Sequence, residues 1–250
     1  MSAHPDHSEQ FPGSSDPALR DQLAKKGEAS HIKSFGVSFP TDIPPMRPRV
    51  RTLLRQNQYE EKETKAALRV VQKGDRVVEM GAGMGYMSSI IAKNCAPSEV
   101  HAFEANPALI PCIRRVHSEN GITNATVHHA LLGPEAGEAE FYVRQQFVES
   151  SMLPDPAESV VSTHKVRVLP ARETIAGIDP DVLICDIEGA EEMVIPLLDL
   201  SRVKNAIVEL HPQYIGLNGV KRVFDAMAAG GLVYNPRRSE AKVVTFTRPG

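Results

Sequence analysis

Three glycines follow an apolar run in the first half of the chain, and their type and spacing suit ligand binding. Gly81, Gly83 and Gly85 come after the expected strand Arg76–Met80, in which Glu79 is the last polar residue. Glycine lets the backbone turn tightly and approach a ligand closely, and the N-terminus of the helix that follows supplies unpaired N–H groups. Such a loop suits either a pyrophosphate or a carboxylate.

The spacing of the glycines separates these two ligands. A nicotinamide or flavin fingerprint has the form GxGxxG, whereas here the third glycine falls one position early and Tyr86 takes its place. The observed ExGxGxG pattern is the arrangement found in Rossmann-like methyltransferases. It predicts that the loop faces the methionine part of S-adenosylmethionine and that Glu79 contacts its ammonium group, directly or through water. Tyr86 packs either on the cofactor or in the core.

An acidic residue, Glu104, ends the next expected strand, Glu99–Phe103. At the carboxyl edge of a parallel sheet its side chain would lie beside the glycine loop and accept hydrogen bonds from both ribose hydroxyls. The alternative is that Glu104 is only a charge at a helix entry, where the helix dipole favours it. The other residues that we expect at the cofactor follow this strand or the third strand: Ala105, Asn106, Ala130 and Leu131.

The elements that must position these residues alternate between short apolar runs and amphipathic stretches. The expected strands are Arg76–Met80, Glu99–Phe103, Ala125–His129, Val182–Asp186 and Ala206–Leu210. The expected helices between them include Tyr86–Asn94 and Pro107–Asn120. This alternation predicts an α/β fold of the Rossmann-like class I methyltransferase type, with a doubly wound, mostly parallel sheet. Leu232–Tyr234 and Lys242–Phe246 predict a C-terminal antiparallel hairpin.

The chain divides into three parts. Residues 1–30 are polar and poor in apolar residues, which predicts a flexible tail. Residues 31–75 predict an extended stretch and one helical region, Arg51–Val71, and residues 76–250 hold the cofactor-binding domain. The polar stretch Gln145–Thr163 predicts a long loop on the acceptor side.

Composition and charge bound the class of protein. The chain has 250 residues, a formal net charge of −3 and a sequence pI near 6.3. This balance gives no electrostatic reason to expect a nucleic acid or an anionic membrane as a partner. Cys95, Cys112 and Cys185 lie far apart, and the N-terminus has no apolar stretch like that of a signal peptide. We therefore expect a cytoplasmic protein with no nucleic-acid or membrane partner; its oligomeric state stays open, a homodimer included.

Four phrases of the sequence resemble those of the FkbM-type methyltransferases, over roughly Gln58 to Pro212: NQYEEKETKAALRVVQKGDRVVEMGAGMGY, VHAFEANPALIPCIRRVHSENG, DVLICDIEGAEEMVIPLL and AIVELHP. The resemblance implies S-adenosylmethionine as cofactor and O-methylation of natural-product, sugar or lipid-linked hydroxyls. The loop departs from the family's usual DxGANxG form, because Glu79 replaces the aspartate and Gly83 the asparagine. This departure puts the acceptor class in doubt rather than the cofactor.

Four polar residues stand where the fourth and fifth strands end: Asp186, Glu188, Glu209 and His211. A hydroxyl acceptor must lose its proton, and we expect this catalytic set to supply the base, with His211 beside Glu209 as the leading candidate. Asp186 could instead cap a helix, or contact the cofactor. The same side chains could gather a divalent cation, but nothing in their spacing demands one, so no metal site is predicted. Glu191 and Glu192 are expected to begin a helix in solvent.

The sequence therefore predicts an S-adenosylmethionine-dependent methyltransferase that acts on a hydroxyl of a small molecule or saccharide. The first alternative is an N-methyltransferase acting on an amine, a peptide or a protein. A dinucleotide-dependent oxidoreductase is disfavoured by the missing fingerprint glycine. The fourth reading is a cofactor-binding protein without catalytic activity, against which the polar strand ends argue only weakly.

Overall fold

The computed structural model describes residues 30–144 and 160–250. The predicted tail, apart from Ser30, and the predicted loop over 145–163, apart from its last four residues, lie outside the described residues. None of the helices in the described ranges is long and apolar enough to cross a membrane.

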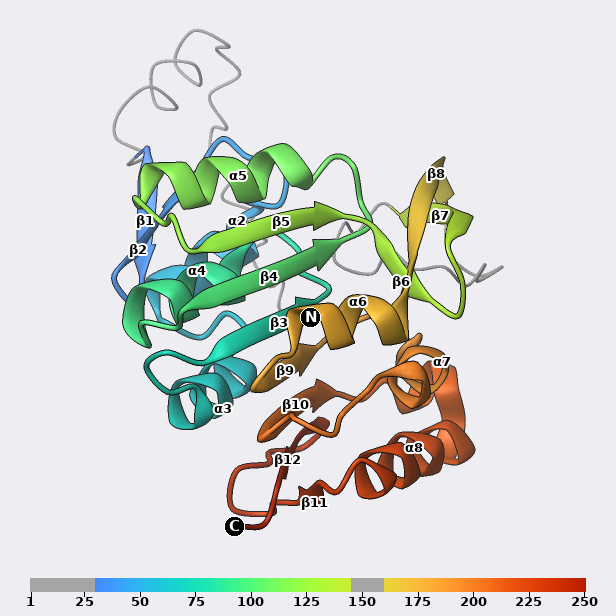
Figure 1. The fold of residues 1–250 in the computed structure, drawn as a ribbon. Coiled ribbons are helices and arrows are strands. Elements are labelled where there is room, and N and C mark those ends of the chain that lie inside the picture. Colours follow the sequence, from blue (N-terminus) through green and yellow to red (C-terminus); the bar gives the residue numbers. More distant parts are fainter. Residues whose placement is uncertain (1–29, 145–159) are drawn as a thin grey trace, which may run out of the picture. The chain divides into compact units, whose positions relative to one another are not determined.

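A seven-stranded sheet runs through the domain formed by residues 31–250, in the order β11-β12-β10-β9-β3-β4-β5 (Figure 1). Its parallel strands are β3 (Arg76–Met80), β4 (Glu99–Glu104), β5 (Ala125–His129), β9 (Val182–Cys185) and β10 (Asn205–Glu209). Strand β12 (Val243–Thr247) is antiparallel to both of its neighbours, β10 and β11 (Val233–Tyr234). The doubly wound, mostly parallel sheet with a C-terminal antiparallel hairpin is thus confirmed.

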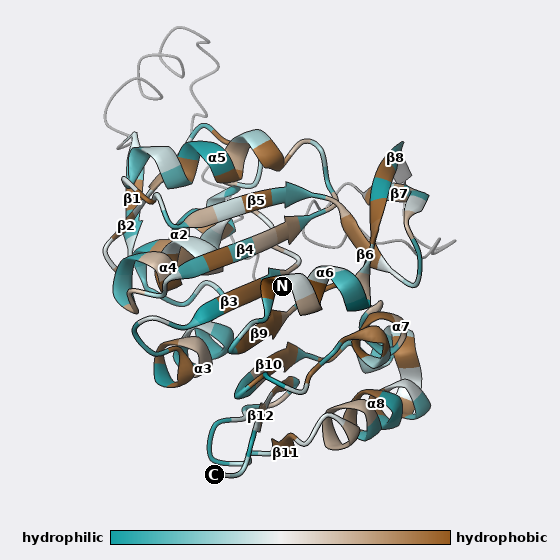
Figure 2. Ribbon diagram, viewed as in Figure 1, coloured by the Kyte–Doolittle hydropathy of each residue, from teal (hydrophilic) through white to brown (hydrophobic). Residues whose placement is uncertain are grey.

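The sheet is buried on both faces over its central strands because these strands are apolar throughout. Successive side chains of a strand point to opposite faces. Val77 therefore packs in one hydrophobic cluster and Val78 in another, on the other side of the sheet. In Figure 2 the central strands are brown, whereas the covering helices carry teal on their outer sides.

Helices cover each face of the sheet. On one face lie α3 (Glu61–Val70), α4 (Tyr86–Asn94) and α5 (Ile110–Glu119). On the other lie α6 (Ala171–Ile178), α7 (Glu191–Val194) and α8 (Pro212–Ala229). A short 3-10 helix, η2 (Ile195–Leu197), continues α7. Because β3, β4, β5, β9 and β10 are parallel, their carboxyl ends meet at one edge of the sheet.

The helical region expected over Arg51–Val71 is divided into two helices. Helix α2 (Pro48–Arg55) ends before α3 begins, and the turn between them holds Asn57 and Glu60 at φ values of 55° and 44°. Left-handed residues cannot continue a helix. The hairpin of β1 (His31–Ser34) and β2 (Val37–Pro40) precedes α2 and shares a buried cluster with it.

The stretch between β5 and α6 forms a separate three-stranded sheet in the order β6-β8-β7. Its strands are β6 (Leu131–Gly133), β7 (Gly137–Arg144) and β8 (Val160–Pro170). Strand β6 directly follows β5 and brings Leu131 to the carboxyl end of the parallel strands.

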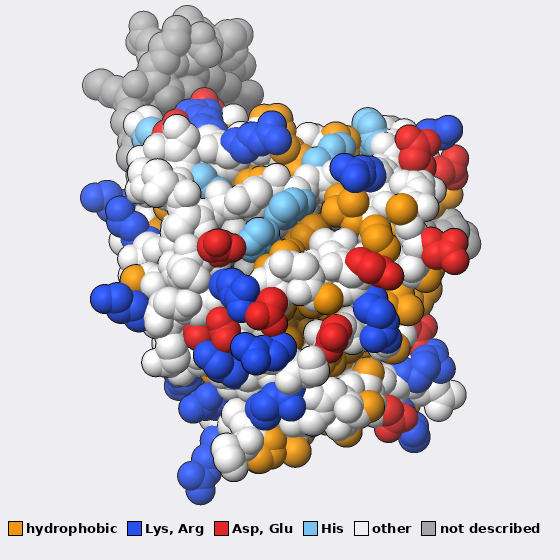
Figure 3. Space-filling view, viewed as in Figure 1, with side chains coloured by type: hydrophobic (Ala, Val, Ile, Leu, Met, Phe, Trp, Pro, Cys, Tyr) orange, Lys and Arg blue, Asp and Glu red, His pale blue; other side chains and the backbone are white. Residues whose placement is uncertain are grey.

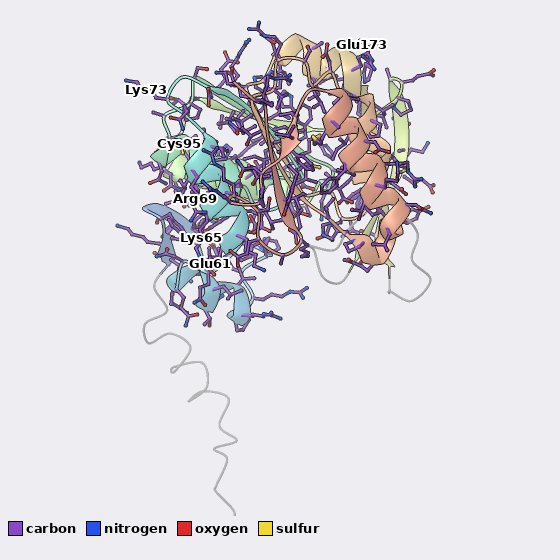
Figure 4. The ribbon with its side chains drawn as sticks, turned by 90° about the horizontal axis from the view of Figure 1, so that it is seen from below. Glu61, Lys65, Arg69, Lys73, Cys95 and Glu173 are labelled. Carbon is purple, nitrogen blue, oxygen red and sulfur yellow. The ribbon has the colours of Figure 1, made fainter. Side chains whose placement is uncertain are left out.

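Helix α3 shows how the outer surface is built. Glu61, Lys65 and Arg69 follow one another at intervals of four residues along its outer side, with Lys73 beyond its end (Figure 4). Lys65 Nζ lies 2.6 Å from Glu61 Oε1. The inner side of the same helix buries Ala66, Ala67 and Val70 against the sheet.

Candidate functional site

A cavity lies at the carboxyl ends of β3, β4 and β9, between the glycine loop and the loop that follows β9. This is the edge at which open α/β sheets bind their ligands. Eight of the residues predicted from the sequence line it: Gly81, Gly83, Glu104, Ala105, Ala130, Leu131, Asp186 and Glu188. We call Gly81, Gly83 and Glu104 the glycine wall of the cavity, and Asp186 and Glu188 its carboxylate wall.

Six other predicted site residues do not line the cavity: Glu79, Gly85, Tyr86, Asn106, Glu209 and His211. Tyr86 packs on Phe39 and Tyr59, and its hydroxyl lies 3.2 Å from that of Ser34. Of the two roles left open for Tyr86, the structure gives it the one in the core.

The glycines of the loop serve three different needs. A Cβ on Gly81 would lie 1.7 Å from the backbone oxygen of Asp186, so only glycine lets β3 and β9 end this close together. A Cβ on Gly85 would lie 2.7 Å from Ile113, so the third glycine packs α4 against α5. Gly83 has open space around its Cβ position, and its N–H donates to Glu104 Oε2 at 2.7 Å.

Glu104 is held firmly by the backbone around it. Besides the bond from Gly83, its Oε1 accepts a hydrogen bond from the Asn106 N–H at 2.7 Å, and the residue is only 7% exposed. Burial raises the pKa of Glu104 to about 7, although these backbone hydrogen bonds oppose the rise. Each carboxylate oxygen has a second lone pair and can accept a further hydrogen bond, for which the ribose hydroxyls would be the donors. The ribose contact stays a prediction.

Two buried polar atoms behind the glycine wall have no partner among the described residues. They are Oε2 of Glu79 and Nδ2 of Asn106. Burial raises the pKa of Glu79 to about 8, against the lowering effect of hydrogen bonds from Ser88. Buried polar atoms are normally satisfied, so their occurrence beside a cavity fits a site that receives a polar ligand. S-adenosylmethionine is a ligand of this kind, because it carries an ammonium group and a carboxylate group.

The carboxylate wall is formed by a tight loop after β9. Asp186 is the first residue of the loop, and Glu188 and Gly189 adopt positive φ values of 49° and 98°. A residue other than glycine rarely adopts such a backbone and does so at a cost of about 1 kcal/mol or more. The surrounding structure therefore imposes the position of the Glu188 side chain.

His211 lies directly behind this wall and is 1% exposed. Its Nε2 is 3.2 Å from Glu188 Oε2 and 3.7 Å from Asp186 Oδ1. Glu209 is the next carboxylate on that side, with an oxygen 3.9 Å from His211 Nε2, and it pairs with Lys242. The structure thus brings the four predicted catalytic residues together, but only Asp186 and Glu188 reach the cavity.

The structure corrects one expectation in this region. Glu191 was expected in solvent with Glu192, yet it is fully buried, and its Oε1 lies 2.8 Å from His211 Nδ1. Glu192 is partly exposed and pairs with Arg222. Glu191 is buried because His211, which directly precedes α8, contacts it at the start of α7. The sequence around Glu191 does not reveal this contact.

The electrostatics of the carboxylate wall are set by burial. Burial raises the pKa of Glu188 to about 7, and burial with the charges of Glu209 and Glu188 raises the pKa of Asp186 well above its usual range. Burial lowers the pKa of His211, but its hydrogen bond to Glu191 and the surrounding carboxylates outweigh this and raise it. A carboxyl with a pKa near 7 is suited to accept a proton at neutral pH.

Sequence reasoning missed three charged residues of this region. Glu60 lines the cavity, and burial raises its pKa and that of Glu63, the latter to about 7. Lys242 comes from the loop before β12 and pairs with Glu209. Glu60 and Glu63 are near a helix start, where acidic residues are usually solvated. No local signal distinguishes them from such residues.

The same region holds the one group of potential metal ligands found among the described residues. Asp186, Glu188 and His211 each offer an atom within 4.8 Å of the others. Carboxylates paired with a histidine have this spacing too, so it does not by itself identify a metal site.

One family model and several solved structures are similar to this chain. The model of the TRM5/TYW2 methyltransferase domain matches residues 51–130, about a third of the chain. No curated protein matches the chain. Among solved structures, M. jannaschii TYW2 in complex with AdoMet is 15% identical, with 89% of each chain covered and a TM-score of 0.45. Precorrin-6y C5,15-methyltransferase from Geobacter metallireducens GS-15 is 15% identical, with 76% of this chain and 88% of that chain covered and a TM-score of 0.45.

Trm5b from Pyrococcus abyssi is 13% identical, with 88% of this chain and 55% of that chain covered and a TM-score of 0.44. The expectation that nucleic acid takes no part was wrong, because Trm5 and TYW2, which give the matching domain its name, act on tRNA.

The matched stretch contains the whole glycine wall and none of the carboxylate wall. It therefore concerns the cofactor side of the cavity, where the glycine spacing, the buried Glu104 and the unpartnered Glu79 and Asn106 lie. The chain is an S-adenosylmethionine-dependent methyltransferase with a Rossmann-like fold.

Proposed function

We propose that this methyltransferase transfers the methyl group to a hydroxyl of a small molecule or saccharide, with Glu188 as the base. The observation that carries the proposal is that Asp186 and Glu188 line the same cavity as the glycine wall. A hydroxyl must lose its proton as it attacks the sulfonium methyl, whereas a neutral amine needs no strong base. The carboxylate wall supplies that base opposite the expected cofactor position.

The acceptor oxygen bonds to the methyl carbon, the bond from that carbon to sulfur breaks, and the hydroxyl proton passes to a Glu188 oxygen. S-adenosylhomocysteine and a methyl ether are the products. Most of the rate comes from holding oxygen, carbon and sulfur in line and from excluding water.

Glu188 is favoured over the other three candidates for two reasons. It reaches the cavity, which His211 and Glu209 do not, and its pKa of about 7 suits a base at neutral pH. Its backbone is held at a positive φ of 49°, an uncommon conformation that is often found at functional positions. Asp186 lines the cavity as well, and we propose that its carboxylate faces the positive sulfonium group.

The resemblance of the DIEGAE and FEANP phrases to FkbM-type methyltransferases supports a hydroxyl acceptor. The DIEGAE phrase contains Asp186, Glu188 and Glu191, so the resemblance falls on the carboxylate wall. This side of the cavity lies outside the residues that match the TRM5/TYW2 domain model.

Methylation of RNA is the second candidate, and the TRM5/TYW2 domain match is the observation that favours it. A nucleic acid would need basic residues around the cavity to neutralise phosphates. On the face drawn in Figure 3, positive and negative side chains are interspersed, and histidines lie over β4 and β5. Among the described residues, the cavity is lined by the acidic side chains of Glu60, Glu104, Asp186 and Glu188 and by no lysine or arginine.

Incubation with methyl-labelled S-adenosylmethionine tests the proposal. Three acceptor pools are offered separately: a panel of saccharides and small alcohols, a panel of amines and peptides, and total RNA. We expect label in the first pool, as an ether that resists base hydrolysis, and its loss in Glu188→Gln. Label in RNA alone would replace the proposal with the second candidate, and label in amines alone would replace it with N-methylation.

A further inference from the structure

Glu191 occupies an unusual position for an acidic residue near the start of a short helix. It is 0% exposed, whereas its neighbour Glu192 is paired with Arg222 at the surface. One oxygen of Glu191, Oε1, accepts two hydrogen bonds. The Gly189 N–H donates at 3.0 Å, and His211 Nδ1 lies at 2.8 Å. A single buried oxygen thus joins the loop of the carboxylate wall to the first turn of α8.

A buried carboxyl group is costly at this place. The second oxygen of Glu191, Oε2, is buried without a hydrogen-bond partner among the described residues. Burying a carboxylate in this way costs free energy, and apolar residues of similar volume often stabilise a protein when they replace buried ionic groups. We therefore expect the carboxyl group of Glu191 to have a role other than stabilising the fold.

The two hydrogen-bond partners of Glu191 are the Gly189 N–H and the His211 ring, and both lie next to Glu188. Gly189 directly follows Glu188, and both residues have positive φ values. A hydrogen bond from outside the loop to a backbone N–H group therefore helps to hold this uncommon conformation. A Cβ on Gly189 would lie 2.8 Å from Tyr214, which shows that the loop packs tightly against α8. On the other side, His211 Nε2 faces Glu188 Oε2 at 3.2 Å.

We propose that Glu191 is a positioning residue that holds the Glu188 loop and the His211 ring in one arrangement. It accepts a hydrogen bond from the protonated Nδ1 of His211, which fixes the ring so that Nε2 points at Glu188. Buried hydrogen bonds to a histidine ring nitrogen select its tautomer and orientation in this way. The proposal rests on the proposed function, in which Glu188 takes the proton of the acceptor.

The charged and titratable groups around His211 come from several elements. Asp186, Glu188 and Glu191 belong to the loop after β9 and to α7, and Glu209 ends β10. Lys242 faces them from the loop before β12 through its pairing with Glu209, and the Tyr214 ring stacks 6.2 Å from the His211 ring. Of these groups, Glu191 is the one in contact with Nδ1.

The test compares two substitutions of Glu191 with the same substitutions of Glu192. Glu191→Leu removes the acceptor and the charge, whereas Glu191→Gln keeps an acceptor oxygen and removes the charge. The protein is labelled with ¹⁵N-histidine and loaded with S-adenosylhomocysteine, and the ring nitrogens are recorded by NMR. A His211→Asn variant assigns the His211 signals among the nine histidines.

In the wild type and in both Glu192 variants, we expect His211 to carry its proton on Nδ1 in the neutral form. Glu191→Gln should keep this tautomer and lower the pKa of His211 by about 1 unit or more, because an adjacent negative charge is lost. Glu191→Leu should lose the tautomer preference. Identical His211 tautomer and pKa in the wild type and both Glu191 variants would overturn the proposal.

Turnover supplies the second readout, with the acceptor that the labelling experiment identifies. Glu191→Leu should lower kcat by about 100-fold with little change in KM, because a small misplacement of the base is costly. Glu191→Gln should recover part of that loss. A folded Glu191→Leu variant with wild-type kcat would contradict the proposal. If no hydroxyl is methylated, the proposed function fails, whereas the NMR comparison still tests the role of Glu191.

Discussion

The two walls of the cavity differ in how their polar groups are satisfied. In the glycine wall, both oxygens of Glu104 accept hydrogen bonds from backbone N–H groups of neighbouring loops. In the carboxylate wall, Asp186 Oδ1 has no hydrogen-bond partner among the described residues, and Glu188 faces a histidine behind it. Backbone hydrogen bonds fix the single carboxyl group of the first wall, while the second wall concentrates two carboxyl groups beside a histidine. Binding needs the first property and proton transfer needs the second.

The largest expected effect breaks the carboxylate wall alone. Glu188→Gln keeps the size of the side chain and removes its capacity to accept a proton. We expect kcat to fall by about 100-fold to 10,000-fold, the range that a general base contributes, with little change in the Kd of S-adenosylhomocysteine. Glu192→Gln, on the exposed side of α7, is the matched control and should leave kcat unchanged. Equal losses of kcat and of cofactor affinity would remove the distinction between the walls.

A pair of glycine substitutions separates close packing from backbone freedom in the glycine wall. Gly81→Ala places a Cβ against the backbone of Asp186, whereas Gly83→Ala meets open space and strains only the backbone. We expect Gly83→Ala to cost about 1 to 2 kcal/mol of unfolding free energy, and Gly81→Ala clearly more. Denaturant unfolding of both variants measures the difference. Equal losses would show that the approach of the two walls at Gly81 does not matter.

The ribose contact expected at Glu104 gives a smaller effect, on binding only. Glu104→Gln retains a side chain of the same size but replaces a charge-assisted acceptor, so the Kd of S-adenosylhomocysteine should rise by about 10-fold. Glu99→Gln, at the exposed start of the same strand, serves as the control. An unchanged Kd in Glu104→Gln would leave Glu104 with the role of a buried structural carboxyl.

The pH dependence of stability follows from the raised pKa values behind and within the glycine wall. Glu79 and Glu104 have pKa values of about 8 and about 7 in the folded protein, against a usual 4.5. At a pH between 4.5 and these raised pKa values, the unfolded chain binds fewer protons than the folded protein. Stability therefore falls as the pH rises through this range. Each group contributes up to about 1.4 kcal/mol per pH unit.

Thermal unfolding of the cofactor-free protein across this pH range measures the effect. We expect the Tm to decrease from about pH 5 to pH 8, and Glu104→Gln to flatten the decrease below about pH 7. A Tm that rises over the same range in the wild type would contradict the raised pKa values.

The smallest effect is expected on the outer side of α3. Glu61 and Lys65 form an exposed ion pair on α3, with side chains 41% and 48% exposed. Glu61→Ala should change the unfolding free energy by less than about 0.5 kcal/mol and leave activity unaltered. Chemical denaturation checks this, and a loss above about 1 kcal/mol would mean that the outer side of α3 supports the site.

The difference between the walls also explains what the sequence could predict. β3 and α4 have the bounds expected for them, because apolar runs, glycines and helix periodicity are local signals. Glu104 and the glycines of the loop follow one another within a short stretch, so their meeting at one edge is a property of a single strand–helix–strand unit. The residues of the glycine wall could therefore be predicted from the sequence alone.

The carboxylate wall depends on long-range burial, and the sequence predicted it only in part. Glu191 is buried by His211, which lies twenty residues further along the chain. Glu60 reaches the cavity because a turn with two left-handed residues divides the expected helix, and no glycine or proline marks that turn. Helix α8 was not predicted either, since Gly216 and Gly219 interrupt its pattern.

Calorimetric titration with S-adenosylhomocysteine tests the central claim most directly. The wild type, Glu104→Gln and Glu188→Gln are each titrated with this ligand and, separately, with NAD. We expect that all three proteins bind S-adenosylhomocysteine, that only Glu104→Gln binds it more weakly, and that NAD gives no signal. Binding of NAD by the wild type without any response to S-adenosylhomocysteine would contradict the assignment of the cavity to S-adenosylmethionine.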